Sequence, residues 1–537
     1  MCPQQQPNRL TRSEFLRTAT GTVAAAATAS SLVGFPAPAE AKTSPPATSG
    51  DGSAAAGSLF DELDARIRAG MREHGVPGVA VGVIYRGTRY IKGYGVTNVD
   101  YPVPVDGQTL FRIGSTTKTF TGTAVMRLVE QGKLDLDARV RTYLPEFATS
   151  QPSVARRVTL RQLLNHSAGW LGEYYADKGR GEDALARYVR GIAQLPQLTP
   201  PGEVFAYNNA ALVLAGRVIE AATGSAYEEV VRELVLDPLR MNHSRFFSDE
   251  IVGFNVAASH VIADGEPVVD TSIWRAPRTL HPTGGLISSV RDQLRYAAFH
   301  LGDGTAPDGT RLLKKKSLFA MRSNPGPGGT LLVELDGMGV TWMLRPSAEG
   351  VRIVQHGGNY LGQHSGFIMV PERGFALTVL TNSDGGPKLL GHLFVDDWAL
   401  RGFAGVSNLP AKPRSLSRPE LVPYEGIYTG QIIDPILLPS GTVVETEIEL
   451  KGTPNGRLRM RRTDSVESPI LDDPSAVAGT EDGPAAEFRL AFYRDDYVLV
   501  YDGSGEPPFR ANFVRGHDGS VEWLRFGGRL YRRHGVK

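Results

Sequence analysis

Ser115-Thr116-Thr117-Lys118 contains the one serine in this chain that is followed by a lysine three positions later. The stretch comes after two predicted strands and opens an apolar helix predicted over residues 120–131. Residues three apart share a helix face, so the Lys118 ammonium can reach the Ser115 hydroxyl, and a helix start favours a neutral lysine. Because a hydroxyl is a poor nucleophile until a base takes its proton, the spacing indicates a serine nucleophile with a lysine partner. The alternative is a helix-capping serine followed by an exposed lysine.

A second candidate element is Phe205-Ala206-Tyr207-Asn208-Asn209, which precedes another apolar helix. A tyrosine in a tight turn can present its phenol to a cleft. If Lys118 stays cationic beside it, the pKa of the phenol falls and tyrosinate becomes a plausible base. Asn209 is a candidate for hydrogen bonds to a substrate amide. The alternative is an ordinary tyrosine in a turn.

The third element is His356-Gly357-Gly358-Asn359, directly after a strand predicted over residues 351–355. Paired glycines let a substrate backbone lie close against an edge strand. The alternative is a hairpin turn. We therefore treat His356, Gly357, Gly358 and Asn359 as candidate substrate-binding residues.

Together, Ser-x-x-Lys, Tyr-x-Asn and His-x-Gly, in this order and at these separations, resemble the serine β-lactamase-related family. That family includes class C β-lactamases, DD-carboxypeptidases, D-aminopeptidases and β-lactamase-fold esterases. The resemblance covers about residues 59–402. Two further segments agree with it: Leu163-Leu164-Asn165-His166-Ser167-Ala168-Gly169 resembles "LLxHxSG", with Ala168 in place of serine, and Gly284-Gly285-Leu286-Ile287-Ser288 resembles "GGLxS".

This resemblance implies roles for the candidate residues. Ser115 is implied as the acylated nucleophile, and Lys118 and Tyr207 as the acid–base pair, with the order of proton transfer left open. The backbone N–H groups of Ser115 and Asn359 are implied as the oxyanion hole.

At the position of His356, many penicillin-binding relatives carry the lysine of Lys-Thr-Gly. A largely neutral histidine should attract a substrate carboxylate less strongly, unless an arginine elsewhere substitutes. Arg275 and Arg278 are the candidates for that arginine. We therefore expect poor β-lactam hydrolysis, and better turnover of esters or of amides that lack a nearby carboxylate.

The order of predicted elements indicates a mixed α/β (α+β) catalytic domain over residues 58–405. Strands at both ends with helices between them imply an antiparallel sheet whose strands come from distant parts of the sequence. The resemblance implies a β-lactamase/transpeptidase-like sheet flanked by helices, with an all-helical subdomain. The predicted strands of this sheet cover residues 79–85, 90–94, 351–355, 364–370 and 376–382.

After a linker predicted over residues 406–417, the hydrophobic pattern has a period of two. Residues 418–537 should form a small antiparallel barrel, and this barrel resembles the lipocalin-like appendage of several such hydrolases. Tyr424-Glu425-Gly426-Ile427-Tyr428 resembles its opening strand. We expect the barrel to fold independently, so that a chain ending near Gly405 stays soluble and acylatable.

The first 41 residues have the pattern of an export signal. Three arginines precede an Ala/Thr-rich stretch over residues 18–35, and Ala39-Glu40-Ala41 offers a cleavage site. The segment around Arg12-Ser13 resembles a twin-arginine signal that has lost its second arginine. A disordered alanine-rich tail is the alternative. Residues 42–57 should be a flexible linker, and no later stretch approaches the ~20 apolar residues of a membrane span. We therefore expect export to the periplasm or the extracellular space.

Composition excludes several other classes of function. The formal net charge is +1 and no long basic run occurs, which argues against nucleic acid as a partner. With Cys2 as the single cysteine and no His-x-x-x-His pair, we expect no metal and no organic cofactor.

The sequence thus predicts an exported serine hydrolase that acts on a small molecule or a short peptide. Our leading hypothesis is an amidase or peptidase of the D-aminopeptidase or DD-peptidase type. The alternatives are a carboxylesterase or acyltransferase on the same fold, and a non-catalytic penicillin-binding or sensor protein. The sequence leaves the oligomeric state open.

Overall fold

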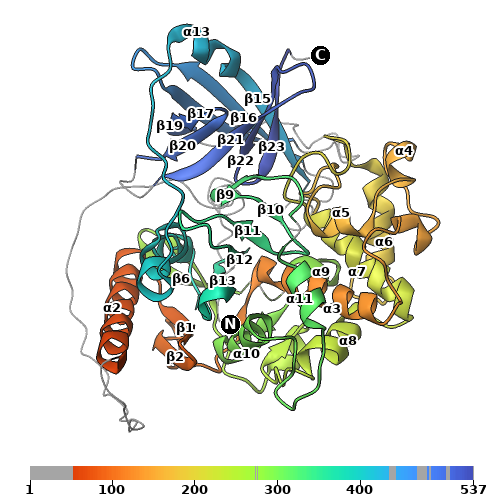
Figure 1. Cartoon of the computed structure of the whole chain (residues 1–537), viewed down its shortest axis with the longest axis vertical. Coiled ribbons are helices and arrows are strands. Elements are labelled where there is room, and N and C mark those ends of the chain that lie inside the picture. Colours follow the sequence, from red (N-terminus) through yellow and green to blue (C-terminus); the bar gives the residue numbers. More distant parts are fainter. Residues whose placement is uncertain are drawn as a thin grey trace, which may run out of the picture.

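The computed structural model describes residues 52–271, 274, 276–323, 325–433, 443–467, 481–482, 485–503 and 508–535. The predicted export signal lies outside these residues. Figure 1 shows a mixed α/β body with a β-barrel above it, drawn in blue. Helix α2 begins at Gly52, within the range predicted to be a linker.

The body contains one large sheet of seven antiparallel strands, in the order β10-β11-β12-β13-β14-β1-β2. The two N-terminal strands join this sheet through β1, where Val79 pairs with Thr381 of β14. The prediction of an antiparallel sheet built from distant parts of the sequence is therefore confirmed. The strand bounds are β1 (Gly78–Tyr85), β2 (Thr88–Gly95), β10 (Gly337–Met338), β11 (Met343–Arg345), β12 (Ile353–Tyr360), β13 (Gln363–Val370) and β14 (Phe375–Thr381).

Most of the other helices, short helical turns and small strands surround this sheet, whereas α13 (Arg418–Leu421) and η11 (Val422–Tyr424) pack on the C-terminal barrel. In chain order they are α2 (Gly52–Glu73), β3 (Phe111–Arg112), η1 (Gly114–Thr116), α3 (Thr117–Glu130), η2 (Val140–Thr142), α4 (Pro152–Ala155), α5 (Leu160–Leu164), α6 (Ala184–Gly191), η3 (Ile192–Gln194), α7 (Asn209–Thr223), α8 (Tyr227–Val231), η4 (Arg232–Leu236), β4 (Ser244–Arg245), η5 (Ser248–Ile251), β5 (Ser259–Ala263), β6 (Glu266–Asp270), η7 (Arg278–Leu280), α9 (His281–Gly284), β7 (Ile287–Ser288), α10 (Val290–Leu301), α11 (Lys315–Ala320), β8 (Gly329–Leu331), β9 (Val333–Leu335), η8 (Pro371–Arg373), α12 (Gly386–Leu390), η9 (Gly391–Val395), η10 (Leu400–Ala404), α13 (Arg418–Leu421) and η11 (Val422–Tyr424).

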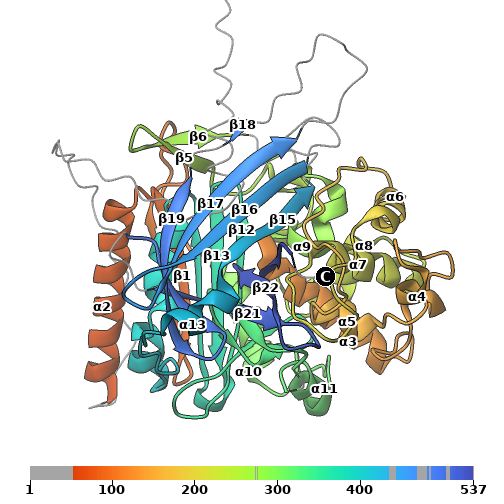
Figure 2. The same cartoon turned by 90° about the horizontal axis from the view of Figure 1, so that it is seen from above.

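The sheet separates two hydrophobic cores because successive side chains of a strand point to opposite faces. Val79, Val81 and Val83 of β1 pack on one face with α2 and α12. Ala80 and Ile84 point to the other face, where α3, α7 and α10 pack. Figure 2 shows α2 on one side of the sheet, and α3, α7 and α8 on the opposite side.

The turn before α7 is fixed by the first residues of that helix. The Asn208 side chain caps the helix by accepting the N–H of Ala211 at 2.7 Å. The helix ends at Gly224, whose φ of 74° is the left-handed conformation that a glycine adopts without strain. Tyr207 therefore sits directly before a rigid helix start.

The C-terminal strands form a barrel that closes because β16 pairs with β17. The prediction of an antiparallel barrel after the catalytic domain is confirmed. The period-two pattern did not predict three of its strands, β15, β18 and β23, although the segment from Tyr424 to Tyr428 was expected to open the barrel. The bounds are β15 (Gly426–Ile433), β16 (Val443–Gly452), β17 (Leu458–Glu467), β18 (Glu481–Asp482), β19 (Ala486–Arg494), β20 (Tyr497–Tyr501), β21 (Phe509–Arg515), β22 (Val521–Phe526) and β23 (Arg529–Arg533).

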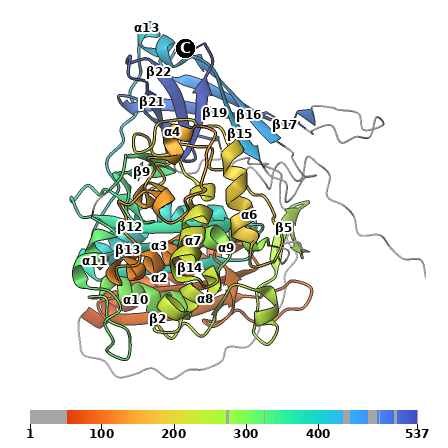
Figure 3. The ribbon, with the colours of Figure 1, turned by 90° about the vertical axis from the view of Figure 1, so that its right-hand side faces the viewer.

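The barrel is hydrogen-bonded to the body over a wide interface, and Figure 3 shows it seated on that body. The N–H of Arg510 donates to the carbonyl of Leu332 at 2.8 Å, and the N–H of Tyr175 donates to the carbonyl of Ile433 at 3.0 Å. Arg525 Nε donates to the carbonyl of Phe205 at 2.9 Å. The barrel thus touches the segment that contains Tyr207. None of the helices within the described ranges is long and apolar enough to cross a membrane.

Candidate active site

Ser115 lies in the tight turn η1, directly before α3. Between residues 111 and 120 it is the one side chain that is not buried. The turn needs Gly114, because its φ is 48° and a Cβ there would lie 2.8 Å from the backbone nitrogen of Asn359. The local backbone therefore brings a partly exposed hydroxyl against strand β12.

Lys118 is fully buried, with 0% of its surface exposed. Its Nζ lies 2.9 Å from Ser115 Oγ and donates to the carbonyl of Thr283 at 2.8 Å. Burial lowers the pKa of Lys118 well below its usual value. The side chain can thus be a neutral amine that accepts the Ser115 proton. The alternative of an exposed lysine is excluded by its burial.

Tyr207 is also buried and packs beside this pair. Its ring centroid lies 4.9 Å from Lys118 Nζ. Burial raises the pKa of Tyr207, and a hydrogen bond with Ser115 lowers it only in part. The structure thus favours a neutral phenol over the tyrosinate expected beside a cationic Lys118, because burial disfavours the charged form of both groups. The geometry suits a neutral phenol that shares a proton with Ser115.

His166, from the "LLxHxSG"-like segment, holds Tyr207 in place. The two rings stack with centroids 4.5 Å apart and an interplanar angle of 13°. His166 Nδ1 accepts the backbone N–H of Asn208 at 2.7 Å, and burial lowers the pKa of His166 well below its usual value. A neutral imidazole thus holds the turn through its contacts with Tyr207 and Asn208.

Asn209 positions its neighbours in the site, because its side-chain amide is already hydrogen-bonded to protein groups. Its Oδ1 accepts the Thr283 hydroxyl at 2.9 Å, and its Nδ2 donates to Tyr175 Oη at 2.8 Å. The same Nδ2 lies 3.3 Å from a carboxylate oxygen of Glu173. The amide therefore organises one wall of the site.

The His356-Gly357-Gly358-Asn359 motif lies inside strand β12, and it is neither a turn nor a segment that follows the strand. Neighbouring β11 pairs only with residues 353–355, whereas β13 pairs with the motif itself. On the β11 side, the motif is thus an edge at which a substrate backbone can add.

The two glycines have different reasons to be there. A Cβ on Gly358 would lie 2.0 Å from the carbonyl oxygen of Ile113 and 2.7 Å from the backbone nitrogen of Ser115. A Cβ on Gly357 would meet only the carbonyl of Ser365, at 3.2 Å. Gly358 therefore lets the nucleophile turn approach β12, and the structure places the backbone nitrogens of Ser115 and Asn359 beside the same turn.

His356 is buried and uncharged at neutral pH. Burial is the main cause that lowers the pKa of His356 to about 3. Its Nδ1–H donates to the carbonyl of Gly357 at 2.7 Å, and its Nε2 is buried without a partner in the described chain. That nitrogen is a hydrogen-bond acceptor available to a substrate.

Glu173 and Arg529 complete the site, and the sequence did not point to either. Arg529 Nε donates to Glu173 Oε1 at 2.9 Å, and its guanidinium carbon lies 4.9 Å from the ring centroid of Tyr207. The Glu173 side chain is 4% exposed, and that of Arg529 is 38% exposed. Arg529 is the first residue of β23, so the barrel supplies a charged group to the catalytic site.

Of the two arginines proposed to substitute for lysine, the structure describes Arg278, which is paired elsewhere. Arg278 donates to both carboxylate oxygens of Glu228 at 3.0 Å, and His281 contacts the same carboxylate. Its charge is therefore already balanced. Arg275 lies outside the described residues.

Metal ligands do not gather around Ser115 in the part of the chain that the structure describes. Among the described residues, a group of three potential metal ligands lies away from Ser115 and consists of Glu73, His74 and His392. Its elements, α2 and η9, pack on the face of the sheet opposite α3.

Comparison with known proteins agrees with this architecture. A family model described as beta-lactamase matches residues 63–396. The chain belongs to the beta-lactamase family. The family expected from the three motifs is therefore confirmed.

Relatives of this chain include a penicillin-binding protein. Penicillin-binding protein 4 of Amycolatopsis lactamdurans is 35% identical over 363 residues, which are 66% of this chain and 94% of that protein. Protein flp of Staphylococcus aureus strain MW2 is 26% identical over 347 residues, 62% of this chain and 65% of that protein.

Solved structures resemble nearly the whole described chain. SurE aligns with a TM-score of 0.66 and 27% identity, covering 89% of this chain and 100% of that one. An octameric penicillin-binding protein homologue from Pyrococcus abyssi aligns with a TM-score of 0.56 and 24% identity, covering 84% of this chain and 99% of that one, and shows the fold alone.

Proposed function

We propose that this beta-lactamase-family chain is an exported serine hydrolase that cleaves an amide or ester bond through an acyl-enzyme on Ser115. The observation that carries the proposal is the 2.9 Å approach of Lys118 Nζ to Ser115 Oγ, with the lysine fully buried. Burial of the amine favours the neutral form that a general base needs. An N-terminal signal would deliver the enzyme to its substrate outside the cytoplasm.

Acylation begins with proton transfer from Ser115 Oγ to Lys118 Nζ. We assign the first base to Lys118 because burial lowers its pKa, whereas burial raises that of Tyr207. The Ser115 oxygen forms a bond with the substrate carbonyl carbon. The resulting oxyanion accepts hydrogen bonds from the backbone N–H groups of Ser115 and Asn359.

Collapse of this intermediate breaks the bond to the leaving group. Tyr207, hydrogen-bonded to Ser115, donates its phenolic proton to the departing nitrogen or oxygen. The proton held by Lys118 then restores the neutral phenol. Water, or another acceptor, attacks the acyl-enzyme by the same steps in reverse and frees Ser115.

The charges around the site favour a substrate without a strongly bound carboxylate. His356 is neutral at the position where many penicillin-binding proteins carry the lysine of Lys-Thr-Gly, and the charge of Arg529 is paired with Glu173. This supports amides and esters over β-lactams, as the motifs suggest. The structure of SurE with D-Leu supports a D-configured residue in the acyl or acceptor position. Small D-amino acid amides are therefore our leading substrates.

A hydrolysis screen tests this proposal. The substrates are paired D- and L-aminoacyl amides, short-chain esters and a chromogenic cephalosporin, each given to the wild type and to Ser115→Ala. We expect the D-aminoacyl amides to turn over fastest, and the cephalosporin slowest. A wild type that hydrolyses the cephalosporin faster than every amide and ester would contradict the substrate assignment.

The same screen separates the two alternatives. Faster turnover of esters, or transfer to an added amine, would indicate a carboxylesterase or an acyltransferase. A stable penicillin adduct without turnover of any substrate would indicate a non-catalytic penicillin-binding or sensor protein.

A further inference from the structure

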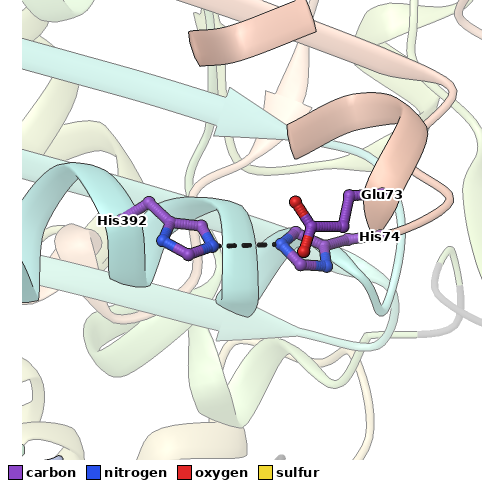
Figure 4. Close-up of side chains that lie close together, drawn as sticks. All are labelled: Glu73, His74 and His392. Carbon is purple, nitrogen blue, oxygen red and sulfur yellow. Dashed lines mark hydrogen bonds between the residues drawn. The ribbon is translucent and has the colours of Figure 1, made fainter. Parts of the chain in front are cut away.

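Two histidines face each other at the contact between α2 and η9, far apart in the sequence. His74 follows the last residue of α2, and His392 lies in η9, directly after α12. Figure 4 shows the two rings pointing toward each other, with the Glu73 carboxylate beside them. The nearest nitrogens, both Nε2, are 3.2 Å apart.

This separation matches the geometry of a shared metal ion. Two nitrogens bound about 2.0–2.1 Å from a tetrahedral zinc ion lie about 3.3–3.4 Å apart. The rings are close to parallel, with an interplanar angle of 13° and centroids 5.4 Å apart. The two Nε2 atoms face each other, and a turn of each ring would direct both lone pairs at one ion in place of the single proton of the histidine–histidine hydrogen bond.

A third ligand stands next to this pair. An oxygen of the Glu73 carboxylate and one nitrogen of each histidine all lie within 4.8 Å of one another. Glu73 is exposed, whereas His74 and His392 are half-buried. Two imidazoles and a carboxylate form a three-ligand set that leaves a fourth position for water.

We propose that Glu73, His74 and His392 form a Zn²⁺ site that fastens α2 to the α12–η9 segment. This contact already joins the two elements, because Gly70 of α2 packs against Leu389 of α12. The ion would add a bond between the N-terminal helix and the last helices of the catalytic domain. The positive charge of Lys388 lies near His74 and would weaken the binding of a cation there.

Zinc titration of the full chain without a histidine tag tests the site. After removal of metals with a chelator, calorimetry should give one Zn²⁺ per chain, and saturating Zn²⁺ should raise the midpoint of thermal unfolding by several degrees. X-ray absorption of the zinc-loaded wild type should show two imidazoles per ion. Fewer than two, or no binding at micromolar zinc, would overturn the proposal without any variant.

Variants locate the ligands. His74→Ala and His392→Ala should each raise the dissociation constant at least about tenfold, and Glu73→Gln should raise it less. His517→Ala removes a histidine that is 92% exposed on the barrel and should leave the constant within about twofold. Equal losses in His392→Ala and His517→Ala would refute the assignment. Labelling of Ser115 by a fluorophosphonate shows whether each variant is folded. If His392→Ala is not folded, His392→Asn takes its place.

Discussion

The backbone N–H of Tyr207 donates to the carbonyl of Gly528 at 2.9 Å. A turn of the C-terminal barrel therefore holds the turn that carries a catalytic candidate. Gly528 has a φ of 78°, and a Cβ there would lie 2.6 Å from Leu331 Cδ1 and 3.4 Å from Tyr207 Cβ. This close approach also sets Arg529, the next residue, beside the Tyr207 ring.

Removing the barrel should disable the site, contrary to the independence that the sequence suggested. A chain ending at Gly405 loses Gly528 and Arg529, and it exposes Ala206, which packs with Trp523 and Leu530 of the barrel. We expect aggregation, or acylation of Ser115 slowed at least about tenfold. A soluble truncated chain that is acylated at the wild-type rate would show that the barrel contacts have no catalytic effect.

Replacing Arg529 alone tests its contribution more finely. Arg529→Ala leaves the Glu173 carboxylate, which is 4% exposed, without its cation, so kcat/KM should fall about 10–100-fold. Arg529→Ala combined with Glu173→Gln should recover part of that loss, because the unpaired charge is gone. The matched control is Arg532→Ala, an exposed arginine on the same strand, which should behave as wild type.

Lys118 and Tyr207 should act as one proton relay through Ser115. Lys118→Ala and Tyr207→Phe are each expected to lower kcat by about 100-fold or more, and the double variant should lose little beyond the worse single variant. Steady-state kinetics on the best amide substrate measures the cycle. Fully multiplicative losses would instead indicate separate roles.

His356 should make stability fall in acid. Its pKa is about 3 in the folded chain and about 6.5 when unfolded, so below pH 6.5 the unfolded state binds a proton that the folded state does not. The free energy of unfolding should therefore decrease as the pH drops from 6.5 toward 3, and this group has no effect above pH 6.5.

Urea unfolding at pH 7 and pH 4.5 measures this effect. His356→Asn should lose about 1–3 kcal/mol less than the wild type between these two pH values. His166 is present in both proteins, so its own titration cancels in the comparison. His517→Asn, on the barrel surface, serves as the control, and its free energy of unfolding should change between the two pH values as much as that of the wild type. An equal loss of unfolding free energy in the wild type and in His356→Asn would contradict a buried, neutral imidazole at His356.

Much of the catalytic body could be predicted because its signals are local. The Ser115–Lys118 spacing works through one helical turn, and the structure brings these two side chains to 2.9 Å. The order of strands and helices also predicted the sheet, since β1 and β14 carry continuous apolar runs that need cover on both faces.

The missed features depend on contacts between distant segments. Strand β23 carries three arginines in five residues, so it lacks the apolar alternation that predicts a strand. Arg529 has a role only because β23 pairs with β22 and the turn between them reaches Tyr207. The neutral phenol of Tyr207 was not expected for a related reason: part of its burial comes from Val333, Leu335 and Met338, which no motif contains.

The central claim, a covalent acyl-enzyme on Ser115, is tested most directly by peptide mass spectrometry of rapidly quenched reactions. The wild type should carry the acyl group of a slow ester substrate, or a fluorophosphonate, on the peptide that contains Ser115, and Ser115→Ala should carry none and lose several orders of magnitude in turnover. Label on a different serine, or full activity in folded Ser115→Ala, would contradict the account.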